Sequence, residues 1–254
     1  MNDTWIGYFP CWNAFFGEVF MNLYLAITLA VLAAPLALSF DRRVAFHRKW
    51  KQLFISMIPV SAAYLAWDIW VTARGDWWFS AEYAGTWKIL GLPPGEWLFF
   101  FVVPYACIFI LEVVRAYFPK YEHTHRTLVN LIGLGVIGVA LFSAVVFREQ
   151  EYTVLALLSF ALWIVAVLVI QPQLFYDSHI LWFFILSTVA FLLVNVILTG
   201  MPIVLYNPQA IWNLRIITIP VEDLLYNTGM LGFYVLSYEG VGRHLARRAD
   251  HEKS

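Results

Sequence analysis

The sequence predicts an all-α membrane protein with about seven transmembrane helices, arranged as two parallel three-helix repeats joined by one linker helix. Three observations support this fold class. Of the 254 residues, 61% are hydrophobic and 13% are charged, and the mean hydropathy is +0.71, far outside the range of soluble domains. Long apolar segments alternate with short polar ones. The two halves of the chain also match each other, without gaps, when Asn195 is laid over Asp68.

Seven apolar segments are long enough to cross a bilayer, which takes roughly 20 residues of helix. They are residues 17–39, 52–72, 97–117, 128–147, 152–170, 180–199 and 224–242. No basic stretch or small-residue cleavage site precedes the first segment, so we expect it to be retained as a helix and not removed as a signal peptide.

The basic residues predict the orientation. Twelve of the sixteen Lys and Arg residues lie on the side that holds loops 40–51, 116–127 and 171–179 and the C-terminal tail. The other side keeps Arg74, Lys88, Arg148 and Arg215. The positive-inside rule therefore places the N-terminus outside the cell membrane and the tail in the cytoplasm. The net charge of -1 argues against binding to nucleic acid.

The ungapped alignment of the two halves matches polar positions as well as apolar segments. It pairs Asp68 with Asn195, Thr72 with Thr199, Pro93 with Pro220, Glu96 with Asp223 and Glu112 with Glu239. A three-helix repeat followed by one extra crossing starts again in the same direction, so an axis along the membrane normal should relate the repeats. The predicted divisions are a first repeat at 1–118, a linker helix at 119–148, a second repeat at 149–245 and a tail at 246–254.

The matched polar residues should meet at the outer-leaflet end of the bundle. Asp68 ends the second apolar segment and Glu96 precedes the third, while Asn195 and the Glu222–Asp223 pair hold these places in the second repeat. A proline followed by acids is also an ordinary helix start, because the acids face the positive end of the helix dipole. Their recurrence and shared depth favour a site, since ionisable groups in membrane helices are commonly functional.

Aromatic residues are concentrated near the same end. An interfacial belt accounts for part of them. A pocket that combines carboxylic acids with aromatic faces can protonate an alkene and shelter the resulting carbocation, which suggests terpenoid cyclisation. The candidate substrate-binding residues are Asn195, Trp67, Trp70, Trp78, Trp97, Tyr206, Arg215 and Tyr226.

Four motifs follow one another across the two repeats. They read AWDIWVTARGDWWF (66–79), LPPGEWLFFFVVPYACIFILEVV (92–114), NVILTGMPIVLYN (195–207) and LRIITIPVEDLLYN (214–227). Together they resemble the paired motifs of the integral-membrane lycopene cyclases, a family that occurs as two small subunits or as one fused chain. The proline-x-acid-acid signature of that family is complete from Pro220 to Asp223. In the first repeat it reads PPGE, with Gly95 in place of the first acid.

The resemblance implies a redox-neutral isomerisation of lycopene. An acid protonates C2 of the acyclic ψ-end, the C5–C6 double bond attacks the C1 cation, and loss of a proton from C6 leaves a β-ionone ring. The expected catalytic residues are Glu222, Asp223, Glu96 and Asp68, with the donor and the base not assigned. Besides lycopene and the lipid bilayer, other carotenoid-pathway enzymes or a second copy of the chain are candidate partners.

We expect no cofactor and no metal. The segment GLGVIG (133–138) fits a dinucleotide-binding glycine pattern, but it lies inside the fourth apolar segment with no strand before it. Helix packing through small residues explains it better. The segment YEHTHR (121–126) offers His123 and His125, too few ligands for a rigid metal site.

Glu112 and Glu239 lie near the cytoplasmic ends of their segments, with Arg115 and Arg243 three and four residues further on. Ion pairing, or snorkelling of the arginine side chains towards the membrane surface, is the favoured interpretation, and a second contact to a substrate end stays open. Two other functions remain as alternatives: a cyclase of a longer or modified carotenoid, and a seven-helix small-solute transporter. A retinal-binding photoreceptor is disfavoured because residues 222–242 contain no lysine.

Overall fold

The computed structural model describes residues 22–122 and 125–251, and within them the chain forms eight α-helices and two small sheets. The helices are α2 (Leu23–Leu38), α3 (Trp50–Arg74), α4 (Ala81–Ala84), α5 (Pro94–Tyr117), α6 (Arg126–Val146), α7 (Glu151–Ile170), α8 (Ser178–Gly200) and α9 (Val221–His251). The short 3-10 helices are η1 (Phe46–Lys49) and η2 (Pro172–Tyr176). The strands are β1 (Trp77–Phe79), β2 (Val204–Tyr206), β3 (Arg215–Ile216) and β4 (Ile219–Pro220).

Seven long helices lie where the seven apolar segments predict them, although residues 17–21 of the first segment lie outside the described ranges. Five described helical segments are long and apolar enough to cross a membrane: Phe46–Arg74, Pro94–Tyr117, Arg126–Val146, Glu151–Ile170 and Ser178–Gly200. Helix α2 is apolar but shorter, and α9 is long but carries many polar residues. The all-α membrane class therefore holds, while seven crossings remain a prediction.

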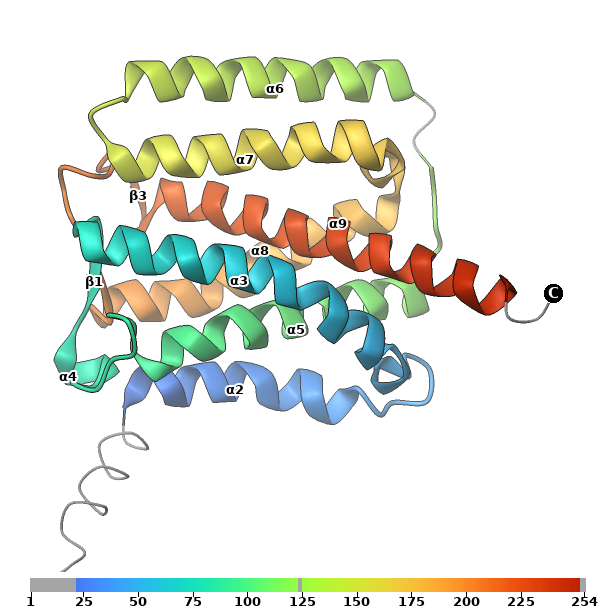
Figure 1. Cartoon of the computed structure of the whole chain (residues 1–254), viewed down its shortest axis with the longest axis horizontal. Helices are drawn as coiled ribbons and strands as arrows, with labels where there is room; N and C mark the ends of the chain where they lie inside the picture. The colour runs from blue at the N-terminus through green and yellow to red at the C-terminus, as the bar shows by residue number, and fades with distance from the viewer. Residues whose placement is uncertain (1–21, 123–124, 252–254) are drawn as a thin grey trace, which may run out of the picture.

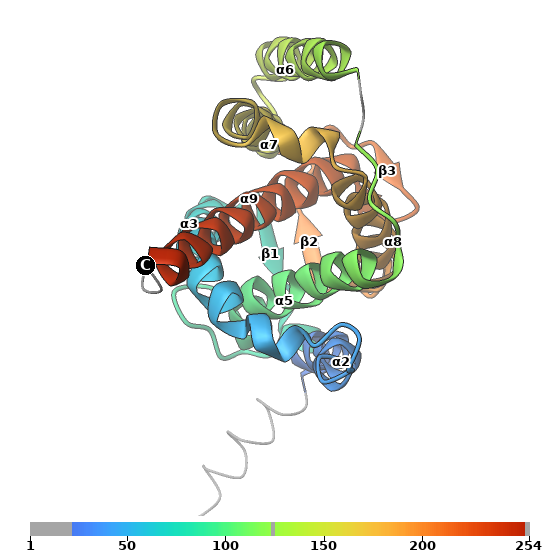
Figure 2. The same cartoon turned by 90° about the vertical axis from the view of Figure 1, so that its right-hand side faces the viewer.

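The long helices run side by side along one direction (Figure 1). Seen end-on, α3, α9, α8 and α5 form a ring, with α2 beside α5 and α6 outermost beyond α7 (Figure 2). Helix α2 packs on α5 and α7 packs on α9, whereas α3 packs on α9 and α8 packs on α5. The first group is α2, α3 and α5, and the second is α7, α8 and α9. In each group the second helix along the chain, α3 or α8, packs on the last helix of the other group, as expected for an internal repeat.

Helix α6 lies apart from both groups and packs on α7. The GLGVIG segment lies within it. A Cβ at Gly133 would lie at an ordinary contact distance of 3.6 Å from Ile164 and Leu168 of α7, whereas a Cβ at Gly135 or Gly138 would meet nothing within 4 Å. Close helix packing through small residues is therefore not seen at these glycines. The domain boundaries at 118, 148 and 245 remain predictions.

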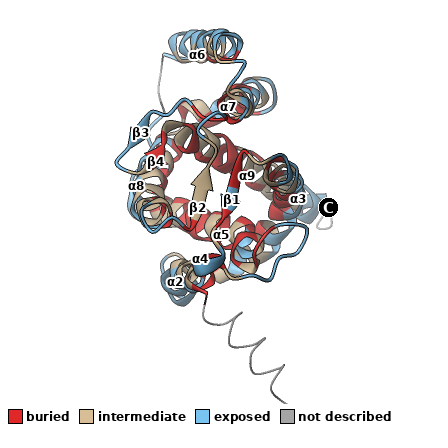
Figure 3. Ribbon diagram, turned by 90° about the vertical axis from the view of Figure 1, so that its left-hand side faces the viewer, coloured by how far each residue is buried: buried red, intermediate tan, exposed pale blue. Residues whose placement is uncertain are grey.

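Strands β1 and β2 cross one end of the ring and pair antiparallel (Figure 3). Trp78 pairs with Leu205 at the centre of the register, and the alignment of the two halves sets these same two residues against each other. An antiparallel pair centred on equivalent residues has a local two-fold axis. The register therefore agrees with two repeats that are related by rotation.

Helix ends follow local signals in the sequence. The Asn22 side chain caps α2 by accepting the Leu25 backbone N–H at 2.6 Å. Helix α3 ends at Gly75, whose φ of +87° is the left-handed conformation that glycine adopts readily. Pro93 is the N-cap of α5, and Pro220 directly precedes α9. These ends bring the acids of both repeats to the β1–β2 end of the bundle.

Candidate functional site

A small cavity of about 70 Å³ lies at the β1–β2 end. Three of the four predicted catalytic acids line it: Asp68 from α3, Glu96 from α5 and Asp223 from α9. Their exposed fractions are only 2%, 8% and 3%. The other lining residues are mostly aromatic: Tyr24, Trp77, Phe79, Phe99, Tyr152, Phe191, Val204, Tyr206 and Tyr226. The cavity combines buried acids with aromatic walls, as the sequence predicted.

The first repeat contributes two buried carboxyl groups to the cavity, those of Asp68 and Glu96. Asp68 Oδ1 accepts from Trp77 Nε1 at 2.9 Å and from the Thr72 hydroxyl at 3.3 Å. Glu96 accepts from the Tyr24 hydroxyl. Within the described ranges, no N–H or O–H group donates to Asp68 Oδ2. Two negative charges buried in one small cavity repel each other, which favours keeping a proton on one of the two groups, so this pair is suited to hold a proton.

The second repeat surrounds a single carboxyl group with donors. Asp223 Oδ1 accepts from the Tyr152 hydroxyl at 2.7 Å. Asp223 Oδ2 accepts from Asn195 Nδ2 at 2.9 Å and from the Tyr206 hydroxyl at 2.7 Å. Burial raises the pKa of Tyr206 well above its usual value, and the charge of Asp223 adds to the shift, so this phenol keeps its proton and donates it. Three neutral donors suit an ionised carboxylate.

Glu222 lies beside Asp223 in the first turn of α9 but does not line the cavity. It is 1% exposed, and its Oε1 accepts from the Thr153 hydroxyl at 2.6 Å and from the Trp212 backbone N–H at 2.5 Å. These contacts tie α9 to α7 and to the loop before β3. Because both acids accept their hydrogen bonds from other elements, an ordinary helix start does not account for them.

Three of the predicted substrate-binding residues lie at the acid site. Tyr206 and Tyr226 line the cavity, and Asn195 contacts it through Asp223. Trp67 packs behind Tyr226, with the ring centroids 5.2 Å apart.

The other four predicted binding residues do not line the acid cavity. Trp70 and Trp78 are 51% and 45% exposed. Trp97 donates to the Ile89 carbonyl. Arg215 lies on exposed β3, with its guanidinium 5.9 Å from the Tyr206 ring centroid. The sequence therefore predicted more aromatic residues at the acid site than line the cavity.

The sequence interpretation missed Tyr24 and Tyr152, the phenols that donate to Glu96 and Asp223. They occupy corresponding places near the starts of α2 and α7. Along the chain, however, Tyr24 and Tyr152 are one residue further apart than Asp68 and Asn195 are. The ungapped alignment therefore sets Tyr24 against Glu151 and conceals the match. If the alignment of the two halves had allowed a gap of one residue before the second apolar segment, it would have matched Tyr24 with Tyr152.

Gly95 explains the incomplete signature of the first repeat. A Cβ at this position would lie 2.8 Å from Cγ of Tyr24 and 3.2 Å from the backbone nitrogen of Leu25. Helix α5 therefore packs directly on α2, and Tyr24 passes over the glycine to reach Glu96. The missing acid is a packing requirement of this repeat.

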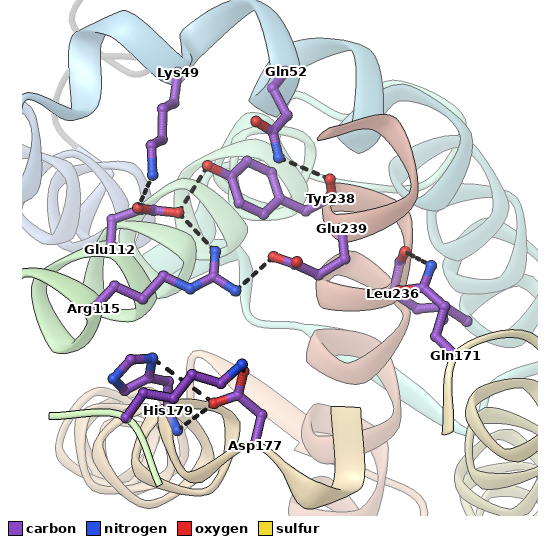
Figure 4. A network of polar contacts seen from close by, with 11 residues as sticks. Lys49, Gln52, Glu112, Arg115, Gln171, Asp177, His179, Leu236, Tyr238 and Glu239 are labelled. Carbon is purple, nitrogen blue, oxygen red and sulfur yellow. Dashed lines mark hydrogen bonds and ion pairs between the residues drawn. The ribbon is translucent and has the colours of Figure 1, made fainter. Parts of the chain in front are cut away.

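A second polar cluster lies at the opposite end of the bundle (Figure 4). Glu112 is 3% exposed and pairs with Lys49 and, at 3.0 Å, with Arg115. Arg115 also pairs with Glu239 of the second repeat at 2.8 Å. The predicted pairing of Glu112 with Arg115 is confirmed. In the described part of the chain, Glu239 pairs with Arg115 and not with the predicted Arg243, so one arginine joins the two repeats.

His123, part of the discounted metal-binding segment, lies outside the described ranges, and His125 directly precedes α6.

A family model described as lycopene cyclase matches the chain twice, over residues 21–114 and 149–241. The two matches cover well over half of the chain, and α6 lies between them. Two matches to one family model suggest an internal repeat. No curated protein and no solved structure matches the chain.

Proposed function

The chain belongs to the lycopene cyclase family, and we propose that it forms β-ionone rings from the ψ-ends of lycopene by acid-catalysed, redox-neutral cyclisation. The family implies an enzyme of carotenoid synthesis, and the apolar helices indicate a membrane protein. The observation that carries the proposal is the cavity at the β1–β2 end, where three buried carboxyl groups face aromatic walls.

The reaction takes up one proton and releases one. Protonation of C2 leaves a cation at C1, the C5–C6 double bond closes onto C1, and C6 then loses a proton. No electron is transferred and no group leaves, so the net change is an isomerisation. C2 and C6 are both bonded to C1 in the closed ring, so two adjacent carboxyl groups can serve both positions.

We assign the starting proton to the Asp68–Glu96 pair, because two carboxyl groups buried in one small cavity repel each other when both are ionised. Once that proton has moved to C2, two carboxylates face each other, and their repulsion favours taking up the C6 proton. Asp223 acts as the fixed negative charge that stabilises the carbocation, together with the aromatic faces around it. Glu222 is a positioning residue for α9.

The direct test is expression in cells that accumulate lycopene, followed by pigment analysis. The expected products carry one or two β-ionone rings, and purified protein should form them without added flavin or nicotinamide. Cells that accumulate a longer or modified acyclic carotenoid provide the comparison. If rings form only in the cells with the longer or modified carotenoid, that carotenoid and not lycopene is the substrate. If no ring forms in either type of cell, the proposal is wrong.

We also propose that the acid site faces the outer leaflet, with the N-terminus outside and the tail in the cytoplasm. The support is the unequal division of basic residues, twelve against four. Reporter fusions should place residue 45 and the C-terminus in the cytoplasm and residue 83 outside. A cytoplasmic reporter at residue 83 would reverse the orientation.

A further inference from the structure

A second and much larger apolar space lies in a groove between α3, α7 and α9. Its volume is about 900 Å³. Trp67 and Trp70 line it near the β1–β2 end, whereas Ile170, Gln171 and Gly240 line it near the opposite end. The groove therefore runs along most of the length of the bundle.

One layer of aromatic side chains separates this groove from the acid cavity. Tyr226 lines the acid cavity, and its ring centroid lies 5.5 Å from that of Tyr64 and 5.2 Å from that of Trp67. Tyr64 and Trp67 line the groove and stack on each other at 5.4 Å. We call these three residues the aromatic partition. The two spaces are thus neighbours, and Tyr226 contacts both sides.

The acid cavity is too small to hold a reacting ψ-end by itself. Its volume is about 70 Å³, whereas an engineered cavity that binds benzene measures about 150 Å³. A ψ-end carries six ring-forming carbons and additional methyl groups, so it is larger than benzene. Ring closure therefore requires at least one lining side chain to change its rotamer. If that side chain belongs to the aromatic partition, its movement opens the cavity towards the groove.

We propose that the groove holds the polyene chain of the carotenoid while its reacting end passes the aromatic partition to the three acids. This inference rests on the proposed function and names the subsite for the unreacted part of the substrate. Along α7 the lining runs from Leu155 to Ile170, about 22 Å at 1.5 Å per residue. A stiff, apolar polyene aligned with the helices fits this length. A lipid acyl chain fits the same walls but has no alkene to present to the acids.

The equivalent residues of the second repeat and of α5 are arranged differently. The alignment of the two halves sets Tyr64, Trp67 and Tyr226 of the partition against Phe191, Val194 and Phe99. Phe191 and Phe99 line the acid cavity itself, and Val194 is much smaller than Trp67. The groove described above leads to one acid site, so a carotenoid with two ψ-ends would be closed one end at a time.

The test narrows the groove with Leu162→Trp, because Leu162 lines it and is 60% exposed, so a larger side chain does not disturb the helix core. Leu131→Trp is the matched control, since Leu131 lies on α6 and is also 60% exposed. Leu158→Trp, at a second lining position, guards against a folding defect of the first variant. All proteins are purified into phospholipid nanodiscs and normalised to folded protein.

Two substrates separate the polyene subsite from the acid site: lycopene, and a short acyclic terpenoid with the same ψ-end but no long polyene. With lycopene, Leu162→Trp and Leu158→Trp should raise KM about tenfold, because displaced apolar contacts weaken binding. With the short terpenoid they should behave as wild type, and Leu131→Trp should match wild type with both. Equal KM values for all proteins with lycopene, or equal losses with both substrates, would overturn the inference.

Failure of the proposed function has a different signature. If wild type closes no ring on either substrate, the groove is tested by the amount of lycopene retained per protein after purification from lycopene-accumulating cells. Lower retention by Leu162→Trp than by Leu131→Trp would keep the groove as a carotenoid site. Equal retention, with phospholipid displaced instead of carotenoid in mass spectra, would assign the groove to lipid.

Discussion

The two repeats present their acids to the same cavity in different ways. In the first repeat, Glu96 shares the cavity with a second carboxyl group, Asp68, and accepts a hydrogen bond from one phenol. In the second repeat, Asn195 stands in the place of Asp68 and donates to Asp223, which also receives two phenols. Asp68 places a second acid beside Glu96, whereas Asn195 at the equivalent position supplies a neutral N–H donor to Asp223. Similar backbones thus provide one carboxyl pair suited to hold a proton and one carboxylate suited to hold a charge.

The largest expected effect comes from the proton-holding pair. Asp68→Asn and Glu96→Gln should each lower ring closure by about 10²- to 10⁴-fold, the usual contribution of a general acid. The measurement is cyclised pigment per membrane protein, with accumulation of each variant checked by immunoblot. Activity close to wild type in both amides would remove the pair from the mechanism.

Asp223→Asn tests the other side of the comparison. Loss of a fixed charge beside a carbocation should lower ring closure by about 10²- to 10³-fold, as for other electrostatic contacts to a transition state. The rate is measured with purified protein and lycopene. A rate within a few-fold of wild type would show that the cation does not depend on this carboxylate.

Tyr24→Phe and Tyr152→Phe form a matched pair across the repeats. Glu96 receives its hydroxyl donor from Tyr24, whereas Asp223 keeps Asn195 and a second phenol when Tyr152 is changed. Each lost bond to a charged group is worth about 1.5–3 kcal/mol, and the remaining donors should reduce the loss at Asp223. We therefore expect about a tenfold loss of rate for Tyr24→Phe and a smaller one for Tyr152→Phe. The reverse order would contradict the division of roles.

Gly95→Ala tests whether the incomplete signature reflects packing. A Cβ 2.8 Å from the Tyr24 ring must push it away from Glu96, with a cost of about 1–3 kcal/mol in stability. Gly135→Ala is the control, because a Cβ there meets nothing within 4 Å. Thermal unfolding in nanodiscs should show a lower midpoint for Gly95→Ala alone. Equal midpoints would mean that α2 and α5 can separate freely.

The smallest effect on catalysis is expected at Glu222. Glu222→Gln keeps an oxygen that accepts from Thr153 and the Trp212 N–H, so ring closure should stay near the wild-type rate. Glu222→Ala leaves both donors unpaired and should cost about 1–3 kcal/mol of stability. If Glu222→Gln is stable but its turnover falls severely, Glu222 is a catalytic residue, as its sequence motif suggests, and not a positioning residue.

The positions of the long helices were predictable because hydrophobicity and helix length depend on local sequence. The meeting of Asp68, Glu96 and Asp223 was also predictable, since an internal repeat implies matched depth. The direction of the Glu222 side chain was not, because adjacent residues on a helix point about 100° apart and the packing of α7 decides which one faces the cavity. Trp70 was predicted to bind substrate near the acids, and its place in the groove could not be predicted, because the groove exists only once α3, α7 and α9 are assembled.

The β1–β2 register has a consequence for how such a protein can be divided. Because the pairing is centred on the equivalent residues Trp78 and Leu205, a separated half would carry a strand edge that also fits a copy of itself. Two first halves would assemble two proton-holding pairs without the charged carboxylate, and two second halves would assemble the reverse. With the roles proposed above, only unlike halves complete the site. By joining one half of each kind in a single polypeptide, α6 fixes their ratio at one to one.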